Sequence, residues 1–453
     1  MRRWTSLMAA TLMLAAPVMA QEVDVDQILE DRVTRDQASI GIAVAVVEEG
    51  ETRFHSAGTL AADSDRPVDE HTVFEAGSIG KLFTNLLLAQ EVQAGTIDLE
   101  TPVVKYLPEG TTIAGGEGDG ITILDLATHH SGLTGLPPEI AERGLENPYA
   151  GSTAEDLLAW LAETELNRPV GDSFEYSNAG LALLGHVLER VTGTPYAELV
   201  ETRIFTPLGM ADSSIGADPA QAERLATGHD AARQPVGNWD MDAFNPAGGL
   251  RSTAADLAKF AAAASGVTET PLAEAFALMF GTTRSTGESG ETIGLGWFIT
   301  PDETIAWHNG ITAGYRSFLG FRRDTGKAVV VLSNMVTEAG IEDIGLNILD
   351  PEIPLREQPK PREAIEIDPA VLEPYVGDYV LGPGAVITIT AEDGHLFAQL
   401  TGQQRFEIFP ESERRFFFKI VDAQITFGEP EDGQSPALVL HQNGMNQTAV
   451  RAE

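Results

Sequence analysis

A cluster of prolines divides this 453-residue chain into two parts with different hydrophobic patterns. The cluster consists of Pro351, Pro354, Pro359 and Pro361. Prolines this closely spaced favour an extended, stiff backbone, so we expect a linker over residues 351–368. After it, short apolar segments recur between turn signals such as Asp393-Gly394 and Asn443-Gly444. This pattern predicts a small, up-and-down, lipocalin-like β-barrel as an accessory domain over residues 369–453.

The predicted barrel strands cover residues 376–381, 386–390, 395–400, 405–409, 415–420, 423–427, 436–441 and 446–450. Because side chains alternate along a strand, Phe416 and Phe418 should face one side and Phe417 the other. Two roles for the barrel stay open. It is either an independent domain, tethered by the linker, with no part in catalysis, or it packs beside a catalytic cleft and narrows that cleft.

The part before the linker mixes strands and helices in an order that indicates an α+β fold. A buried strand at 40–47 is followed by a second strand through Phe54, and a helix-rich stretch occupies about 100–250. Further strands are predicted at 293–300, 303–308, 315–322 and 328–333. Helices are predicted at 25–33, 123–132, 153–166, 179–191 and 337–349. This order predicts an antiparallel sheet flanked by helices, with a separate helical lobe.

Ser78 and Lys81 stand three residues apart at the start of an apolar helical stripe. Residues at i and i+3 of a helix share a face, so the amine can reach the hydroxyl and take its proton. The helix N-terminus adds N–H groups that favour a developing oxyanion. This S-x-x-K pattern is typical of serine hydrolases. The alternative is a helix-capping serine beside a solvated lysine.

The N-terminus and the composition limit the function classes. Arg2 and Arg3, the apolar stretch Leu7–Ala16 and the small-residue site ending at Ala20 predict a secretory signal over residues 1–20, hence a periplasmic or secreted protein. The absence of cysteine excludes disulfides and thiolate chemistry. A net charge of −39 argues against nucleic acid or anionic membranes as partners.

Two further segments accompany the S-x-x-K pattern. Phe174–Gly180 holds Tyr176 and Asn178, and Trp307–Tyr315 holds His308-Asn309-Gly310. Three more segments add to the pattern, namely Thr128–Leu133, Pro207–Met210 and Asn245–Thr253. In this combination and order the chain resembles the serine β-lactamase and penicillin-binding family. The class C β-lactamases, D,D-carboxypeptidases, D-aminopeptidases and family VIII esterases are the most similar members, and the resemblance extends over about residues 21–350.

The resemblance implies a role for each matched residue. Ser78 would be the acylated nucleophile, Lys81 would help to deprotonate it, and Tyr176 would act as general base and then pass the proton to the leaving group. The substrate would be bound by Asn178, His308, Asn309, Gly310 and Thr312. The oxyanion hole would consist of the Ser78 N–H and, by spacing, the N–H of Thr312. No cofactor and no metal are implied, and the partner is a small-molecule or peptide substrate.

His308 departs from the Lys-Thr-Gly motif of many β-lactamases. An imidazole of ordinary pKa is mostly neutral at pH 7, so its attraction for a substrate carboxylate should be weaker and pH-dependent. This favours hydrolysis of small amides, D-amino-acid peptides or esters through an acyl-enzyme. A β-lactamase, or a penicillin-binding sensor that does not turn over, is the alternative.

Two other classes of enzyme fit less well. An α/β-hydrolase would require G-x-S-x-G, which Ala76–Gly80 misses by one glycine. A metalloenzyme is disfavoured because His129 and His130 are adjacent and would diverge on a helix.

Overall fold

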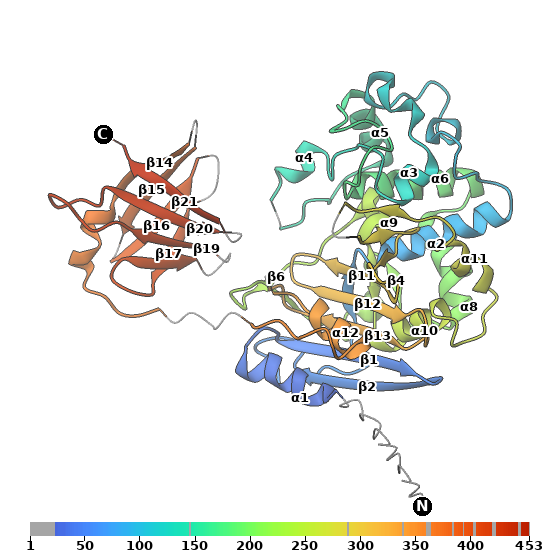
Figure 1. Cartoon of the computed structure of the whole chain (residues 1–453), viewed down its shortest axis with the longest axis horizontal. Coiled ribbons are helices and arrows are strands. Elements are labelled where there is room, and N and C mark those ends of the chain that lie inside the picture. The colour runs from blue at the N-terminus through green and yellow to red at the C-terminus, as the bar shows by residue number, and fades with distance from the viewer. Residues whose placement is uncertain are drawn as a thin grey trace, which may run out of the picture.

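The computed structural model describes residues 23–452, apart from residues 145, 288–289, 338, 359–363, 383–384, 393, 402–404, 419–422 and 443–444. The predicted secretory signal and part of the predicted linker lie outside the described residues. Figure 1 shows a larger part, in which helices flank a sheet, and a smaller C-terminal barrel. The predicted α+β class with a separate all-β barrel is therefore confirmed. Within the described ranges, no helix combines the length and the hydropathy needed to cross a bilayer.

The main sheet of the larger part is antiparallel, and its described residues form eight strands in the order β2-β1-β13-β12-β11-β10-β9-β8. Its strands are β1 (Gly41–Glu48), β2 (Glu51–Gly58), β8 (Arg284–Ser285), β9 (Thr292–Ile293), β10 (Phe298–Ile299), β11 (Ile305–Ile311), β12 (Arg316–Arg322) and β13 (Ala328–Ser333). The predicted strand at 293–300 is instead the two short strands β9 and β10. The chain turns between them, where Gly296 has a φ of 81° and Gly294 N donates to the Trp297 carbonyl at 2.8 Å.

The centre of this sheet is buried on both faces. Ala43 and Ala45 of β1 belong to the core that contains α2 and α10, whereas Val44 and Val46 belong to the core that contains α1 and α12. This explains why the β1 sequence is uniformly apolar rather than alternating. The helices that cover the sheet are α1 (Val25–Glu30), α2 (Gly80–Gln93), α10 (Ala254–Ala264) and α12 (Glu342–Leu349). The predicted helix at 337–349 thus begins later, at Glu342.

The remaining helices form the helical lobe and its connections. They are α3 (Ile123–Ala127), α4 (Pro138–Ala141), α5 (Ala154–Glu163), α6 (Asn178–Thr192), α7 (Tyr196–Val200), α8 (Thr206–Leu208), α9 (Asn245–Gly248) and α11 (Ala273–Leu278). Thr122 and Thr153 form reciprocal capping boxes at the starts of α3 and α5. Ser177 caps α6 by accepting from Gly180 N, and Gly193 ends that helix in a left-handed conformation. The Ser177 cap fixes the start of α6, where the Tyr-Ser-Asn segment lies.

A small second sheet carries the segment that leads to Ser78. Its strands, in the order β3-β7-β4, are β3 (Phe74–Gly77), β7 (Leu250–Ser252) and β4 (Ser214–Ile215). A separate two-stranded sheet consists of β5 (Gly228–His229) and β6 (Pro235–Val236), and His229 forms a bridge with Met335 after β13.

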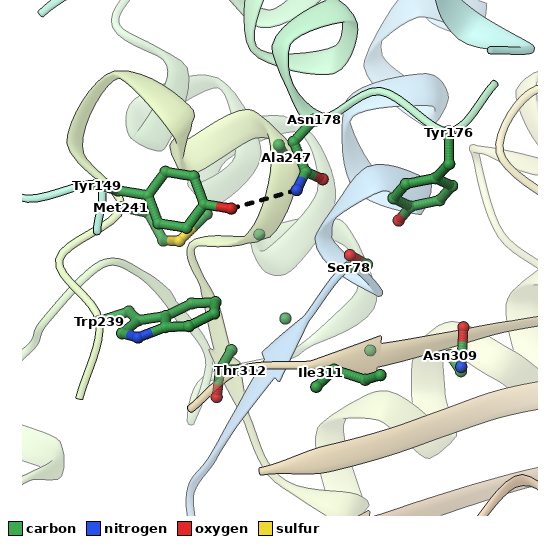
Figure 2. A pocket seen from close by; sticks show the side chains of 13 residues that line it. Ser78, Tyr149, Tyr176, Asn178, Trp239, Met241, Ala247, Asn309, Ile311 and Thr312 are labelled. Carbon is green, nitrogen blue, oxygen red and sulfur yellow. Dashed lines mark hydrogen bonds between the residues drawn. The ribbon is translucent and has the colours of Figure 1, made fainter. Parts of the chain in front are cut away.

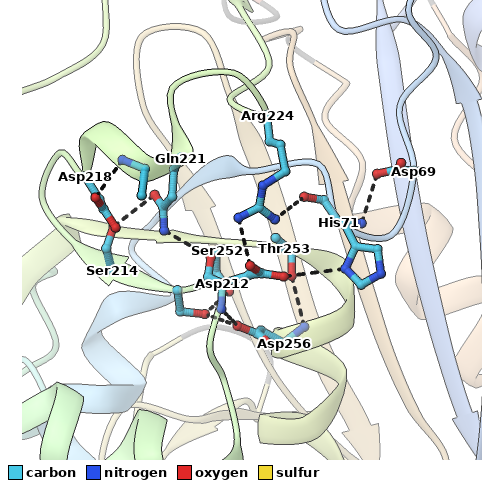
Figure 3. Close-up of polar contacts among 12 residues, drawn as sticks. Asp69, His71, Asp212, Ser214, Asp218, Gln221, Arg224, Ser252, Thr253 and Asp256 are labelled. Atoms are coloured by element: carbon cyan, nitrogen blue, oxygen red, sulfur yellow. Dashed lines mark hydrogen bonds and ion pairs between the residues drawn. The ribbon is translucent and has the colours of Figure 1, made fainter.

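A polar network holds the chain just before β3 (Figure 3). The buried Asp256 carboxylate accepts from Asp212 N at 2.7 Å and from the Ser213 hydroxyl at 2.9 Å. Arg224 in turn donates to the Asp212 carboxylate at 2.8 Å and to the His71 carbonyl at 3.2 Å. The start of β3 is therefore tied to α10 and to the segment before β4.

The C-terminal part is a closed barrel in which each strand pairs with the next along the chain and β21 pairs back with β14. Its strands are β14 (Gly377–Gly382), β15 (Ala385–Glu392), β16 (His395–Leu400), β17 (Phe406–Pro410), β18 (Arg415–Phe418), β19 (Ala423–Phe427), β20 (Ala437–Gln442) and β21 (Met445–Arg451). Phe416 and Phe418 pack into the barrel core and Phe417 does not, as the alternation predicts. Tyr375 and Phe427 stack at 4.3 Å within that core.

Candidate active site

Ser78 lies in the turn between β3 and α2. The turn requires Gly77, which has a φ of 52° and faces the backbone of Ile311 so closely that a Cβ there would lie 3.0 Å from Ile311 N. The hydroxyl of Ser78 is exposed to a cavity of about 330 Å³. The sheet edge and the helix start therefore present this serine to a ligand-sized space.

Lys81 is the second residue of α2 and is completely buried. Its Nζ is 2.9 Å from the Ser78 Oγ, 2.7 Å from the Asn178 Oδ1 and 2.6 Å from the carbonyl oxygen of Ala247. Burial holds the pKa of Lys81 well below its usual value. The amine therefore has a larger neutral fraction near pH 7 than a solvated lysine, and in that form it can accept the serine proton.

Tyr176 completes the group around the nucleophile. Its ring lies 4.8 Å from the Lys81 Nζ and stacks on His129 at a centroid distance of 4.4 Å. Burial raises the pKa of Tyr176 above its usual value, although the nearby Ser78 hydroxyl acts in the opposite direction. His129 has a φ of 60°, and its Nδ1 accepts from Ser177 N at 3.1 Å, which orients the ring against Tyr176.

Asn178 and Tyr149 form the opposite side of the site. The Asn178 amide accepts from Lys81 through its oxygen and donates through its nitrogen to the Tyr149 hydroxyl at 3.2 Å (Figure 2). Burial raises the pKa of Tyr149 to about 12, so the phenol stays protonated at neutral pH. The sequence analysis missed Tyr149, because it lies in a loop without a recognisable motif.

The backbone geometry does not support Thr312 as the second oxyanion donor. Thr312 N donates to the Tyr315 carbonyl at 3.1 Å and is therefore occupied within the turn that connects β11 to β12. Because N–H groups alternate between the two sides of an antiparallel strand, the Ile311 N–H points away from β12. It lies beside Gly77, on the side of the nucleophile. The N–H groups of Ser78 and Ile311 are thus the pair that faces the cavity, one residue from the predicted position.

His308 does not face the substrate cavity. It is completely buried, its Nδ1 lies 2.6 Å from the carbonyl oxygen of Asn309, and its Nε2 has no hydrogen-bond partner among the described residues. Burial and the nearby Lys81 lower the pKa of His308 to about 3, so the imidazole is neutral at pH 7. The predicted carboxylate contact that changes between pH 6 and 7 is therefore wrong.

The two residues after His308 do line the cavity. The Asn309 amide donates to the Glu342 carboxylate at 2.8 Å, which holds that side chain against α12. Gly310 allows β11 to approach β3, since a Cβ there would lie 2.1 Å from the Ala76 carbonyl oxygen. Asn309 and Gly310 therefore shape the cavity edge.

Figure 2 shows Ser78 between the Tyr176 and Asn178 side chains on one side and the end of β11 on the other. The cavity is lined by Gly77, Ser78, Tyr149, Tyr176, Asn178, Trp239, Met241, Ala247, Gly248, Asn309, Gly310, Ile311 and Thr312. None of these residues is acidic or basic. Among the described residues, no group of three or more His, Cys, Asp or Glu side chains is arranged to hold a metal ion.

Residues 25–350 match the family described as Beta-lactamase. This chain belongs to the β-lactamase family. Residues 361–451 match a family described as a domain of unknown function (DUF3471). The predicted resemblance to serine β-lactamases and penicillin-binding proteins is thus confirmed.

Relatives of this β-lactamase family member include penicillin-binding proteins and peptidases. The chain is 27% identical over 445 residues to Penicillin-binding protein 4* of Bacillus subtilis (strain 168), which covers 90% of this chain and 94% of that protein. It is 26% identical to a β-lactamase of Escherichia coli (strain K12), covering 73% and 94% of the two chains. It is 29% identical to the D-alanyl-D-alanine-carboxypeptidase/endopeptidase AmpH of Escherichia coli (strain K12), covering 51% and 58%.

Solved structures agree on the fold. A class C β-lactamase superposes with a TM-score of 0.62 at 23% identity, covering 70% of this chain and 91% of that one. The class C β-lactamase from Rhodobacter sphaeroides gives a TM-score of 0.59 at 25% identity, covering 70% and 95%.

Proposed function

We propose that this protein is an exported serine hydrolase that cleaves small esters, amides or D-amino-acid peptides through an acyl-enzyme on Ser78. The observation that carries the proposal is the contact between the buried Lys81 amine and the Ser78 hydroxyl at 2.9 Å. A lysine held in this way can activate a serine as nucleophile. The curated relatives, which include β-lactamases and a carboxypeptidase, support hydrolysis of an acyl bond as the reaction class.

The lowered pKa of Lys81 and the raised pKa of Tyr176 suggest a different proton-transfer role for each residue. The lowered pKa of Lys81 suits the general base that removes the Ser78 proton. The raised pKa of Tyr176 keeps its phenol protonated, so Tyr176 would give its proton to the leaving group and take up in exchange the proton that Lys81 removed from Ser78. The N–H groups of Ser78 and Ile311 would bind the oxyanion that forms on the substrate carbonyl.

The uncharged cavity favours substrates without a carboxylate near the reacting carbonyl. No lysine, arginine or charged histidine lines it, and the neutral His308 is buried behind it. The Asn309 amide is already bound to Glu342, which also pairs with Arg316 at 3.3 Å. Neutral esters and neutral amides therefore fit the cavity better than β-lactams or peptides that end in a carboxylate.

A second candidate is a penicillin-binding protein that is acylated and releases product slowly. The alignment with Penicillin-binding protein 4* along 90% of this chain favours it. The two candidates differ in deacylation, since a sensor would accumulate a stable adduct on Ser78.

One substrate panel tests both candidates. It contains p-nitrophenyl acetate, D-Ala-p-nitroanilide, a D-Ala-D-Ala peptide and a chromogenic cephalosporin. We expect turnover of the ester and the anilide at higher kcat/KM than of the two carboxylate-bearing substrates. Preferred turnover of the cephalosporin or the dipeptide would overturn the substrate class, and acylation without turnover would establish the sensor.

A further inference from the structure

One wall of the catalytic cavity is made by two loops that are distant in the sequence. The loop at 147–152 contributes Tyr149, and the loop at 238–242 contributes Trp239 and Met241. The rings of Tyr149 and Trp239 meet edge to face at a centroid distance of 5.5 Å, and Figure 2 shows both beside Met241. The position of this wall relative to Ser78 depends on how the two loops are joined.

A reciprocal pair of hydrogen bonds joins the loops. The Asn147 amide donates to the Asp240 carboxylate at 2.9 Å, and Asp240 N donates back to the Asn147 side-chain oxygen at 2.9 Å. Neither residue lines the cavity, and Asp240 is exposed. We call this pair the Asn147–Asp240 clasp.

Each loop also has hydrogen bonds to residues outside the clasp. Arg143 donates to the carbonyl oxygens of Pro148 and Ala150, at 3.1 and 2.9 Å, on either side of Tyr149. Trp239 N donates to the buried Glu75 carboxylate at 3.2 Å. The two loops are also joined at their far ends, where Gly151 N donates to the Asp242 carboxylate at 2.7 Å and Ala243 N donates to the Ser152 carbonyl at 3.3 Å. These contacts remain when the clasp is broken, so the clasp controls the spacing of the loops at the end where Asn147 and Asp240 lie.

Space is available behind this wall. Tyr149 packs on Phe244 at a centroid distance of 5.1 Å, and Phe244 lines a second cavity of about 790 Å³ together with Ser152 and Arg143. The Tyr149–Phe244 contact thus separates the catalytic cavity from a larger one. If the loop at 147–152 retracted, the catalytic cavity could lengthen on this side.

We propose that the Asn147–Asp240 clasp determines the size of the acyl group that the catalytic cavity accepts. This inference rests on the proposed acyl hydrolysis at Ser78. With the clasp closed, Tyr149 and Trp239 meet and restrict the cavity to short acyl groups. With the clasp open, the loops that carry Tyr149 and Trp239 separate, and a longer, uncharged acyl chain fits between them.

The test compares kcat/KM for p-nitrophenyl acetate and p-nitrophenyl octanoate in Asn147→Ala, Asp240→Ala and the double variant. Octanoate should gain about three- to tenfold over acetate, the scale of one or two net hydrogen bonds, through a lower KM. Acetate hydrolysis should stay within about twofold of wild type. The double variant should gain no more than Asn147→Ala, which already removes both bonds, whereas Asp240→Ala keeps the bond from the backbone N–H at position 240 to Asn147 and should gain less.

Charge-swapped variants separate the clasp from a general loosening. Asn147→Asp alone places two carboxylates face to face and should raise the octanoate preference most. The swapped pair Asn147→Asp with Asp240→Asn keeps one amide opposite one carboxylate and should restore the wild-type ratio. Glu146→Ala, a change at the exposed neighbour, is the matched control and should leave the ratio unchanged.

An unchanged octanoate-to-acetate ratio in all clasp variants would overturn the inference while the proposed function stands. A parallel loss on both esters, or a swapped pair that fails to restore the ratio, would show that the pair is merely structural. If the wild type hydrolysed neither ester, the proposed function itself would fail.

Discussion

The Nζ atom of Lys81 lies 2.9 Å from the Oγ atom of Ser78, in a position without solvent exposure. Its other two partners, the Asn178 oxygen and the Ala247 carbonyl, are uncharged acceptors. Since none of the carboxylates that the structure describes pairs with this ammonium, burial makes its charged form unfavourable. Burial without a charged partner therefore makes Lys81 a usable base and also lowers the stability of the folded protein.

Replacing Lys81 should reduce activity and raise stability. Lys81→Met should lower kcat by about 10²-fold or more, the scale of general acid–base catalysis. The folded pKa of Lys81 is below the unfolded value of 10.5, so the unfolded state binds more protons between these two values and wild-type stability rises with pH there. Lys81→Met should remove that dependence and raise the melting temperature at pH 7. A lower melting temperature with an unchanged pH slope would contradict a neutral buried amine.

Ser78→Ala should abolish turnover and covalent labelling by a fluorophosphonate or a penicillin probe. Intact-mass measurement after incubation with the probe checks this result, and circular dichroism checks that the fold is kept. Ser152→Ala is the control, because Ser152 lines the second cavity rather than the catalytic one. Labelling that survives in Ser78→Ala and maps to another serine would refute the assignment of the nucleophile.

Tyr176→Phe should lower kcat by about 10²-fold or more while the ring keeps its contact with His129 at 4.4 Å. Because Lys81 and Tyr176 act on the same proton path, the double variant with Lys81→Met should lose far less than the product of the single losses. Steady-state kinetics of the three variants measure this coupling. Independent, multiplicative losses would indicate separate proton paths.

The protonation of His308 should not change kcat/KM between pH 6 and 7. Its folded pKa is about 3, so the imidazole stays neutral there and cannot attract a substrate carboxylate. Because this value is below the unfolded value of 6.5, the unfolded state binds more protons between pH 6.5 and 3, and stability falls as the pH falls through that range. His308→Asn should show a smaller loss of stability over the same range. Urea titrations at several pH values compare the two proteins, and an equal slope would contradict the assignment.

The sequence alone predicted the features that depend on residues close together in the chain. The three-residue spacing brings Lys81, in the first turn of α2, to 2.9 Å from Ser78 in the turn before it. Tyr176 and Asn178 stand at a capped helix start. The structure brings these side chains around one cavity, as expected. The barrel strands were also predictable, because each pairs with its neighbour in the chain and alternates its side chains.

The remaining site residues depend on tertiary structure. Tyr149 and Trp239 come from loops that meet only when the fold is complete, and neither stands in a motif. His308 could have been placed by strand alternation, since buried and less buried residues alternate from Trp307 to Ile311. The shift of the oxyanion donor from Thr312 to Ile311 depends on a hydrogen-bond register that spacing alone does not define.

Removal of the barrel should leave the catalytic part folded and active. Within the described residues, the catalytic cores and the barrel core have no residue in common, and the barrel closes on its own strands. A chain that ends at Gln358 should therefore keep its label on Ser78 and its kcat/KM for p-nitrophenyl acetate within about twofold. The informative measurement is the rate on bulky esters and long peptides relative to acetate. A rise in that ratio on truncation would mean that the barrel narrows the cleft by steric contact. Equal ratios in two folded proteins would leave the barrel as an independent unit on the proline linker, which is the outcome that the separate cores favour.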